Sequence, residues 1–364
     1  MVFFIRRNIM HMADALLSPA VGGAMLAVGA AAIGLSVRSI ARESGEASKI
    51  DAAGFDDRKI PIMGIMGAFV FAGQMINFTI PATGSSGHIG GGILLAALLG
   101  PAPALVTLAS VLLIQCLFFA DGGLLAYGCN VFNMGVTSCI AAYTFIYKPL
   151  IQKGLTKRNI TIASVAAVTA GLLAGSFFVV LETLASGVTE LPFATFVALM
   201  LPIHLAIGIV EGLVTAAVLC FVHSARPELL AGALPAAVPV PVPAKAFSYR
   251  KVLVVFGVLT VLVAGGLSLF ASAYPDGLEW SMEKTAGTTE LEREGSVYEA
   301  AAGIVDKTAF MPDYGFRGAG ESAGAAGTAA AGITGSIITV LLAGGIGLAA
   351  AAFRRRKART AESA

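Results

Sequence analysis

Charged residues are absent from long stretches of this chain. Between Lys59 and Asp121 there is no Asp, Glu, Lys or Arg. Further uncharged stretches lie at 122–147, 159–181, 191–210, 252–275 and 322–353. A helix that crosses a bilayer needs roughly 20 mostly apolar residues. Each stretch is therefore long enough to hold at least one membrane crossing.

The composition supports this interpretation. Hydrophobic residues make up 57% of the chain and charged residues only 13%, whereas soluble domains carry about 25% charged residues. The 43 glycines suit helices that pack closely in lipid. The net charge of +2 comes without a basic, aromatic-rich patch, so we expect lipid and not nucleic acid as a partner. The four cysteines lack CxxC spacing and are expected to be buried apolar side chains.

The distribution of Lys and Arg predicts an orientation, because loops rich in these residues face the cytoplasm. Basic residues are concentrated at 38–59, 148–158, 226–251 and 354–359. The connections at 79–91, 121–130 and 184–192 contain neither Lys nor Arg and are expected to face outward. The pattern predicts a multi-pass protein of the plasma (inner) membrane, with its N-terminus outside and its C-terminus in the cytoplasm.

This orientation predicts an all-α polytopic membrane protein with nine crossings, seven in a first unit and two in a second. The predicted helices are 17–37, 61–78, two short helices within 89–120 broken at Gly100–Pro101, 131–147, 160–181, 193–222, 252–273 and 331–353. The Pro-rich stretch ALPAAVPVPVPAKA (232–245) is a stiff, extended connection. We therefore predict a seven-helix membrane domain at 10–224, a cytoplasmic linker at 225–250, and a two-helix unit at 251–356 with an external segment.

Two histidines suggest a metal site on the outer side. His88 lies in the loop PATGSSGHIGGG, and His11 directly follows Met10 ahead of the first helix. In a chain that began at Met10, the amine of Met10, the backbone nitrogen of His11 and its imidazole would close adjacent chelate rings on one metal. His88 would supply a fourth nitrogen. Such a set suits Ni(II) or Cu(II), and imidazole also accepts Co(II).

The nine residues ahead of Met10 read MVFFIRRNI. They are too short for a signal peptide, and they place Arg6 and Arg7 on the outer face, against the orientation rule. We therefore expect Met10 to be the first residue of the functional protein.

Other polar residues near these segments have two interpretations each. Five of them either orient a metal-bound imidazole or cap helix ends: Gln74, Asn77, Asp121, Asn130 and Asn133. His204 and Glu211 lie seven residues apart on one face of a predicted crossing. Ionisable groups inside a span usually mark a pathway or a buried pair. A purely structural hydrogen bond between helices is an equal alternative.

Four segments carry a family resemblance: MHMADALLSP, FVFAGQMINFTIPATGSSGHIGGG, LFFADGGLLAYGCNVFNMG and HLAIGIVEGLVTA. In this order, over about residues 10–222, they resemble the CbiM/NikM family, the substrate-binding components of energy-coupling-factor cobalt and nickel transporters. The resemblance implies a seven-helix membrane protein that takes up Co²⁺ or Ni²⁺ for cobalamin synthesis or nickel enzymes, with no permanent cofactor. The implied ligands are Met10, His11 and His88. The loop PATGSSGH departs from the Gly-Gly-Thr-Ser-Gly-His pattern common in relatives, but it keeps the histidine.

The segments PDGLEWSMEK (275–284) and MPDYGF (311–316) resemble the PDGLE domain, an auxiliary membrane unit fused to such proteins or encoded beside them. The resemblance implies a role in metal loading or assembly. Asp276, Glu279 and Asp313 are acidic enough to attract cations on the outer side, but each of them taken singly is expected to be solvated in an external loop.

The chain contains no GxxxxGK[ST] segment, so ATP hydrolysis would belong to separate partners. The family resemblance implies a transmembrane coupling (T) subunit and ATPase subunits. Two other classes of function stay open at this point. One is an intramembrane metalloenzyme that uses His204 and Glu211, and the other is a passive metal channel.

Overall fold

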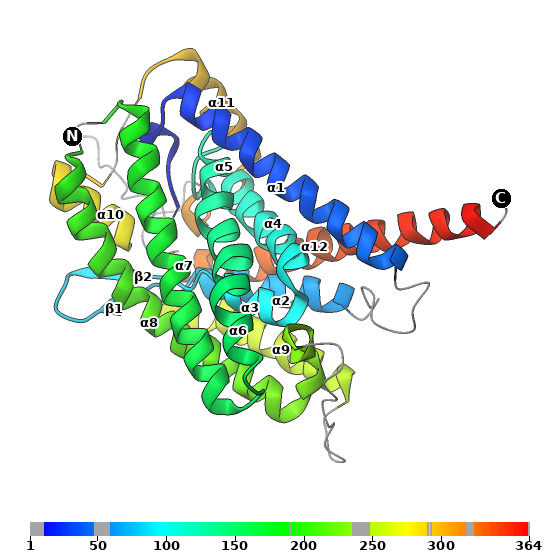
Figure 1. Cartoon of the computed structure of the whole chain (residues 1–364). Helices are drawn as coiled ribbons and strands as arrows, with labels where there is room; N and C mark the ends of the chain where they lie inside the picture. The colour runs from blue at the N-terminus through cyan, green and yellow to red at the C-terminus, as the bar shows by residue number, and fades with distance from the viewer. Residues whose placement is uncertain are drawn as a thin grey trace.

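The protein is a bundle of long helices with a small β-hairpin at one side (Figure 1). The computed structural model describes residues 11–46, 59–189, 191–234, 248–289, 291, 293–317 and 324–362. The Met10 prediction and most of the Pro-rich linker lie outside these residues.

The first part of the chain forms the larger share of the bundle. Its elements are η1 (Asp14–Leu16), α1 (Pro19–Glu46), α2 (Lys59–Gln74), β1 (Phe78–Ile80), β2 (Ser85–Gly87), α3 (Gly92–Leu99), α4 (Pro101–Phe119), α5 (Tyr127–Asn130), the π-helix η2 (Val131–Tyr147), α6 (Lys148–Ile151), α7 (Lys157–Ser186), α8 (Phe193–Ala225) and η3 (Pro227–Ala233).

The second part contributes two long helices and the short helices between them. Its elements are α9 (Tyr249–Gly265), η4 (Leu267–Phe270), α10 (Gly277–Ala286), α11 (Ser296–Thr308), η5 (Pro312–Tyr314) and α12 (Gly324–Glu362).

The all-α membrane class predicted from the sequence is confirmed. Within the described residues, seven helical segments are long and apolar enough to cross a membrane: Pro19–Ala41, Pro101–Phe119, Tyr127–Ile151, Lys157–Ser186, Phe193–Ala225, Tyr249–Phe270 and Ala326–Ala349. Large apolar side chains on their outer faces are exposed, among them Leu213 (52%), Val254 (63%) and Leu341 (69%). Exposed apolar surface of this extent belongs against lipid and not water.

The remaining two predicted crossings are shorter than expected. Helix α2 has 16 residues. Helix α3 has eight, which at the rise of an α-helix is about 12 Å, too short for a hydrocarbon core of about 30 Å. The break predicted at Gly100–Pro101 is present, because Gly100 has a φ of 87° and α4 begins with Pro101. All eight residues of α3 are buried, so this helix fills the centre of the bundle.

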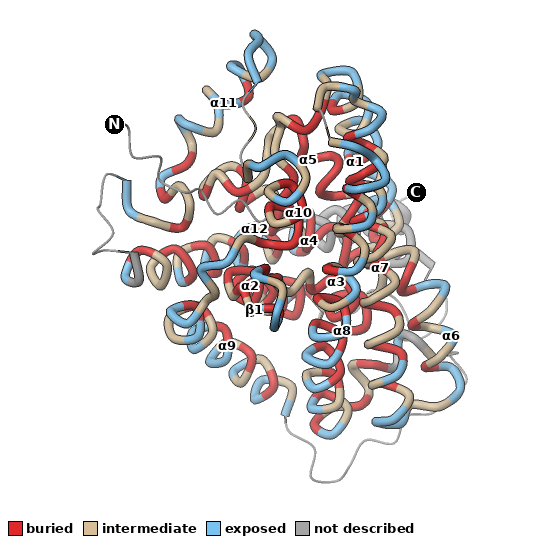
Figure 2. Tube along the Cα trace, turned by 90° about the vertical axis from the view of Figure 1, so that its left-hand side faces the viewer, coloured by how far each residue is buried: buried red, intermediate tan, exposed pale blue. Residues whose placement is uncertain are grey.

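Small residues bring neighbouring helices together in the core. Helices α7 and α8 pack along their lengths. A Cβ atom on Gly208 would come within 2.8 Å of the Thr169 Cα, and one on Gly212 within 2.6 Å of the Val165 Cα. Figure 2 shows the buried positions concentrated on the inward sides of the helices and the exposed ones around the rim. This packing is the pattern by which small residues hold helices in lipid.

The two parts of the chain pack as one body. Helix α12 lies against α2, α4 and α9, and α9 also packs on α2. The external segment between α9 and α12, predicted as a solvated connection, forms α10, α11 and η5. Helix α10 packs on α8, next to the antiparallel hairpin β1–β2. The sequence predicted neither this hairpin nor these helices.

We predict that Gly128→Ala destabilises the bundle by about 1–3 kcal/mol, the usual cost of overpacking. The new methyl group would overlap the backbone of α1 at Met25 and Leu26, which cannot move aside as a flexible side chain does. Thermal unfolding in detergent measures the effect. Gly23→Ala, on the exposed side of α1 with nothing within 4 Å of the new methyl group, is the control. Equal melting temperatures for the two variants would contradict the prediction.

Candidate functional site

His11 enters the bundle just before η1 and is buried, with 3% of its surface exposed. The next residue anchors the segment to the start of η2. The Met12 backbone N–H donates to the Asn130 Oδ1 at 3.0 Å, and the Asn130 Nδ2 donates back to the Met12 carbonyl at 3.1 Å. The side-chain amide of Asn130 thus makes with the Met12 backbone the two hydrogen bonds that a neighbouring β-strand would make. These two bonds fix the position from which the His11 imidazole projects.

Gln115, on α4, sets the tautomer of His11. The His11 Nε2–H donates to the Gln115 Oε1 at 2.9 Å, so the lone pair of the ring lies on Nδ1. The Nδ1 atom is buried and has no hydrogen-bond partner among the described residues. A buried ring nitrogen without a partner is costly unless something binds it. An imidazole oriented by a hydrogen bond through its other nitrogen is the usual arrangement of a metal ligand.

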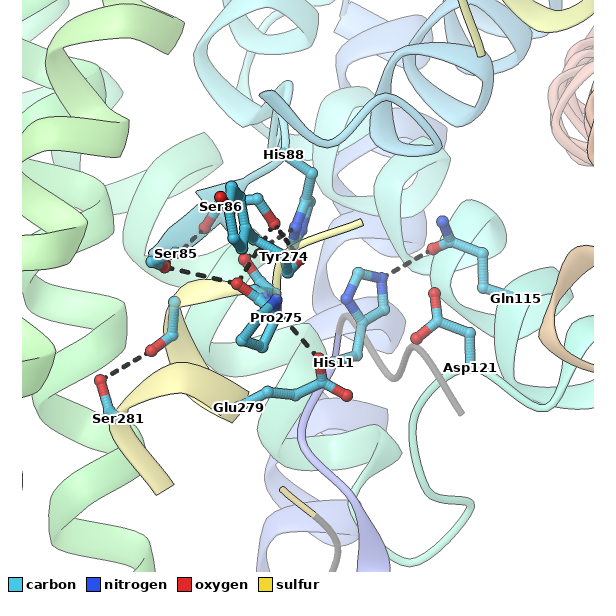
Figure 3. A network of polar contacts seen from close by, with 12 residues as sticks. His11, Ser85, Ser86, His88, Gln115, Asp121, Tyr274, Pro275, Glu279 and Ser281 are labelled. Atoms are coloured by element: carbon cyan, nitrogen blue, oxygen red, sulfur yellow. Dashed lines mark hydrogen bonds and ion pairs between the residues drawn. The ribbon is translucent and has the colours of Figure 1, made fainter. Parts of the chain in front are cut away.

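His88 follows β2 and faces His11. The two ring centroids are 5.4 Å apart, and Figure 3 shows His11 between His88 on one side and Gln115 on the other. The structure thus brings together the two histidines that the sequence selected, although they lie 77 positions apart (88 − 11).

The glycine-rich loop after His88 is held by side chains from two helices. The Gly91 backbone N–H donates to the Glu211 Oε1 at 2.8 Å, and the Gln74 Nε2 donates to the Gly90 carbonyl at 3.0 Å. Gly91 has a φ of 76°, a conformation that glycine adopts without strain. Glu211 on α8 therefore holds the backbone of this loop through its Oε1, and its buried Oε2 has no hydrogen-bond partner among the described residues.

Asp276, at the start of α10, lies beside His88. Its Oδ1 is 3.6 Å from the His88 Nδ1, and only 4% of the residue is exposed. Glu279 is likewise buried, at 5%. The expectation that these two acidic residues are solvated was wrong, because the external segment folds against the hairpin and does not extend into water.

The charge of Asp276 changes the protonation of its neighbour. Burial by itself lowers the pKa of His88, but the negative charge of Asp276, with smaller contributions from Asp121 and Glu211, outweighs it and raises this pKa above its ordinary value. Burial raises the pKa of Asp276 in turn, but the nearby His88 outweighs this and lowers it. Both shifts favour the ionised pair.

One cavity of about 90 Å³ lies beside His11, His88 and Asp276. The described residues that line it are His11, Met12, His88, Gly90, Asn130, Asn133, Met134, Ser138, Leu172, Gly175, Ser176, Val179, Met200, His204, Ile207, Asp276 and Leu278. His204 therefore reaches the cavity, with its Nδ1 at 2.8 Å from the Met200 carbonyl. His204 and Glu211, considered as a pair from the sequence, each contact a different partner.

Of the five other polar residues selected from the sequence, two line this cavity, and Gln74, Asn77 and Asp121 do not. Asn130 and Asn133 line it, and the Asn133 Nδ2 donates to the Glu182 Oε2 of α7 at 2.7 Å. Asp121 accepts a hydrogen bond from the Tyr314 hydroxyl at 2.6 Å. Gln74 acts on the loop and not on an imidazole. The buried Asn77 accepts a bond from the Ser272 N–H through its backbone carbonyl.

The described residues do not form a closed metal site. No group of three or more His, Cys, Asp or Glu side chains among them has metal-binding geometry. Of the four cysteines, which were expected to be buried, Cys116, Cys129 and Cys139 are buried and Cys220 is partly exposed. A cation in this cavity would therefore need a further donor beside the histidines, or a small rearrangement of the side chains around it.

Comparison with known proteins identifies the family. The model of the CbiM family, described as the "cobalt uptake substrate-specific transmembrane region", matches residues 11–229, which is more than half of the chain. The chain belongs to the CbiM family. The PDGLE domain model matches residues 250–352.

Relatives with both parts of the chain exist. A relative from Archaeoglobus fulgidus is 30% identical over 92% of this chain and 96% of its own length. The fused nickel transport protein NikMN of Rhodobacter capsulatus is 29% identical, with 83% of each chain covered. The cobalt transport protein CbiM of Geobacter sulfurreducens is 32% identical over 76% of this chain and 78% of its own.

Two site residues, Gln115 and Glu182, were not selected from the sequence. Gln115 lies within an otherwise apolar predicted crossing, and Glu182 directly follows the predicted crossing 160–181. A polar side chain inside a span is itself a signal of function. Asp276 was named only as an acidic residue of the PDGLE motif, because nothing in its local sequence indicates that α10 docks beside His88.

We predict that Asp276→Asn lowers the pKa of His88, because burial still opposes the charged imidazole while the nearest negative charge is lost. The ionised pair stabilises the fold between the lowered pKa of Asp276 and the raised pKa of His88, and its contribution is lost as the pH rises through the pKa of His88. NMR titration of isotope-labelled histidine in the metal-free protein measures it. His204→Ala, His223→Ala and His11→Ala variants assign the His88 signal. An unchanged titration in the Asn variant would contradict the prediction.

Proposed function

We propose that this chain is the substrate-capturing membrane subunit of a transporter that takes up Co(II) or Ni(II). The observation that carries the proposal is that His11 and His88 line one cavity with their ring centroids 5.4 Å apart, and that the buried His11 Nδ1 has no hydrogen-bond partner among the described residues. Imidazole nitrogen is a preferred ligand of both cations. The names of the relatives from Geobacter sulfurreducens and Rhodobacter capsulatus support this choice of cargo.

The proposed ligands are His11 and His88 together with Met10. Met10 precedes His11 in the sequence, so its amine would complete a chelate with the backbone nitrogen and imidazole of His11 if it were the first residue. This would supply the donor that the described residues lack. Asn130 supports the arrangement, because it holds the backbone at Met12 in place.

Energy for uptake would come from partner subunits. The chain has no P-loop, and its family is named for the substrate-specific part of an uptake system. We propose a transmembrane T subunit and ATPase subunits as these partners. The basic loops favour an outward N-terminus and a cytoplasmic C-terminus in the plasma membrane.

The alternatives fit the geometry less well. A hydrolytic metalloenzyme would need Glu211 as a free base near a metal, but its Oε1 accepts from the Gly91 backbone. The relatives are named as transport proteins. A passive channel would need no tight site, so stoichiometric metal binding discriminates between it and a capture subunit.

We predict that the detergent-purified protein binds one Ni(II) or Co(II) per chain and that His88→Ala reduces this binding at least a hundredfold. Isothermal titration calorimetry and metal analysis measure it. His223→Ala is the matched control, because His223 lies at the other end of α8 from His204 and does not line the cavity. Uptake of the metal by cells that lack other carriers, with and without the partner subunits, tests transport itself. Full binding by the His88 variant would rule out this site.

We predict that Gln115→Leu weakens metal binding roughly 10- to 100-fold, the usual effect of losing the group that orients a metal-ligating histidine. The variant leaves the His11 Nε2–H without its acceptor and no longer fixes the ring. The same calorimetric titration measures the change. Gln152→Leu, at an exposed position beyond α6, serves as the control. Equal affinities would show that Gln115 does not support a ligand.

A further inference from the structure

The segment 274–280, which carries the PDGLE motif, is built onto the loop of His88. Ser86 is the point of attachment: its N–H donates to the Pro275 carbonyl at 2.8 Å, and its hydroxyl donates to the Tyr274 carbonyl at 2.7 Å. Ser86 and Asp276 also form an isolated parallel β-bridge, so this segment lies beside the hairpin. The Trp280 indole N–H donates to the Thr83 carbonyl at 3.1 Å and fixes the far end.

The residues of the motif each fit this contact. Gly277 leaves no room for a side chain, because a Cβ atom there would lie 3.0 Å from Ile207 and 3.2 Å from the His204 ring. Leu278 is buried and lines the cavity. The Glu279 carboxylate accepts from the Asp276 backbone N–H at 3.4 Å, which starts helix α10. These contacts hold Asp276 at the start of α10, where its Oδ1 lies 3.6 Å from the His88 Nδ1.

Asp276 differs in charge from the other described residues that line the cavity. Among the described residues that line it, Asp276 is the only carboxylate, and there is no lysine or arginine. The other polar groups are imidazoles, amides, hydroxyls and backbone. A divalent cation moved from water into a low-dielectric site lined by neutral donors is strongly disfavoured unless negative charge accompanies it.

We propose that Asp276 binds the transported cation: its carboxylate supplies the negative charge that holds a divalent transition-metal ion in the cavity beside His88. This inference rests on the proposed function and extends it. The second unit of the chain thereby contributes a binding residue to the site of the first. Because a ligating imidazole must be neutral, binding of the cation would release the proton of His88 to water, and the carboxylate of Asp276 would then pair with the cation. His11 lines the same cavity, and its buried Nδ1 has no hydrogen-bond partner among the described residues, so nitrogen and oxygen donors lie around one space.

The experiment compares Asp276→Asn and Asp276→Ser with the unaltered full-length chain. Asn and Ser both start helices as well as Asp does, so the two variants remove the charge and keep the beginning of α10. Asp306→Asn, at an exposed position on α11, is the control for loss of one acidic residue. Ni(II) and Co(II) affinities are measured by calorimetry in detergent. The chain's single tryptophan, Trp280, reports by its fluorescence whether the segment stays docked.

The expected result is at least a tenfold loss of affinity in the Asp276 variants, with unchanged tryptophan emission and no change in Asp306→Asn. Unchanged or tighter binding in a docked variant overturns the proposal, the latter because Asp276 would then compete with the metal for His88. Loss of docking in both variants assigns Asp276 to assembly and also overturns it. Absence of metal binding by the unaltered chain would refute the proposed function instead, so the two failures are distinguishable.

Discussion

The structure depends on satisfying the polar backbone of one irregular loop inside a bundle of apolar helices. Within a membrane, non-helical backbone is tolerated only where the protein itself supplies hydrogen-bond partners. The stretch from Ser86 to Gly91 obtains them from three places: α8 through Glu211, α2 through Gln74, and the segment at Pro275. Because these partners come from distant parts of the sequence, the loop orders the helices around it. The position of His88 follows from the same bonds.

This arrangement changes how the two units of the chain are understood. The sequence separates them by a Pro-rich stretch, and the family models match them separately. In the structure, α12 packs on α2, the Tyr314 hydroxyl binds Asp121, and Pro275 accepts from Ser86. A second unit that only anchored the first in the membrane would need none of these polar contacts. Their concentration around His88 and Asp121 makes the second unit part of the cavity's wall.

The sequence predicted the fold where physical signals are local. Uncharged stretches indicate crossings because a charge in lipid is costly wherever it lies, and the break at Gly100–Pro101 follows from the backbone of those two residues alone. The same local signals did not predict the length of a helix or the elements that depend on their protein surroundings. Helix α3 is as apolar as a crossing but only eight residues long, since it is surrounded by protein and not by lipid. The hairpin of β1 and β2 has three residues per strand, too few for any periodic pattern to show.

The site was predictable to the extent that its residues are unusual in sequence. A histidine in a Gly- and Ser-rich loop and another beside Met10 are rare enough in so apolar a chain to attract attention. The roles of Gln115 and Asp276 can be recognised only in the folded structure. Gln115 acts through a 2.9 Å hydrogen bond to His11, and Asp276 through a 3.6 Å contact with His88. Such contacts join residues 104 and 188 positions apart (115 − 11 and 276 − 88). Hydrophobic patterns place a helix but not its rotation. It is this rotation that directs the amide of Gln115 at an imidazole and not at lipid, so the orientation of metal ligands is the part of the site that sequence patterns leave undetermined.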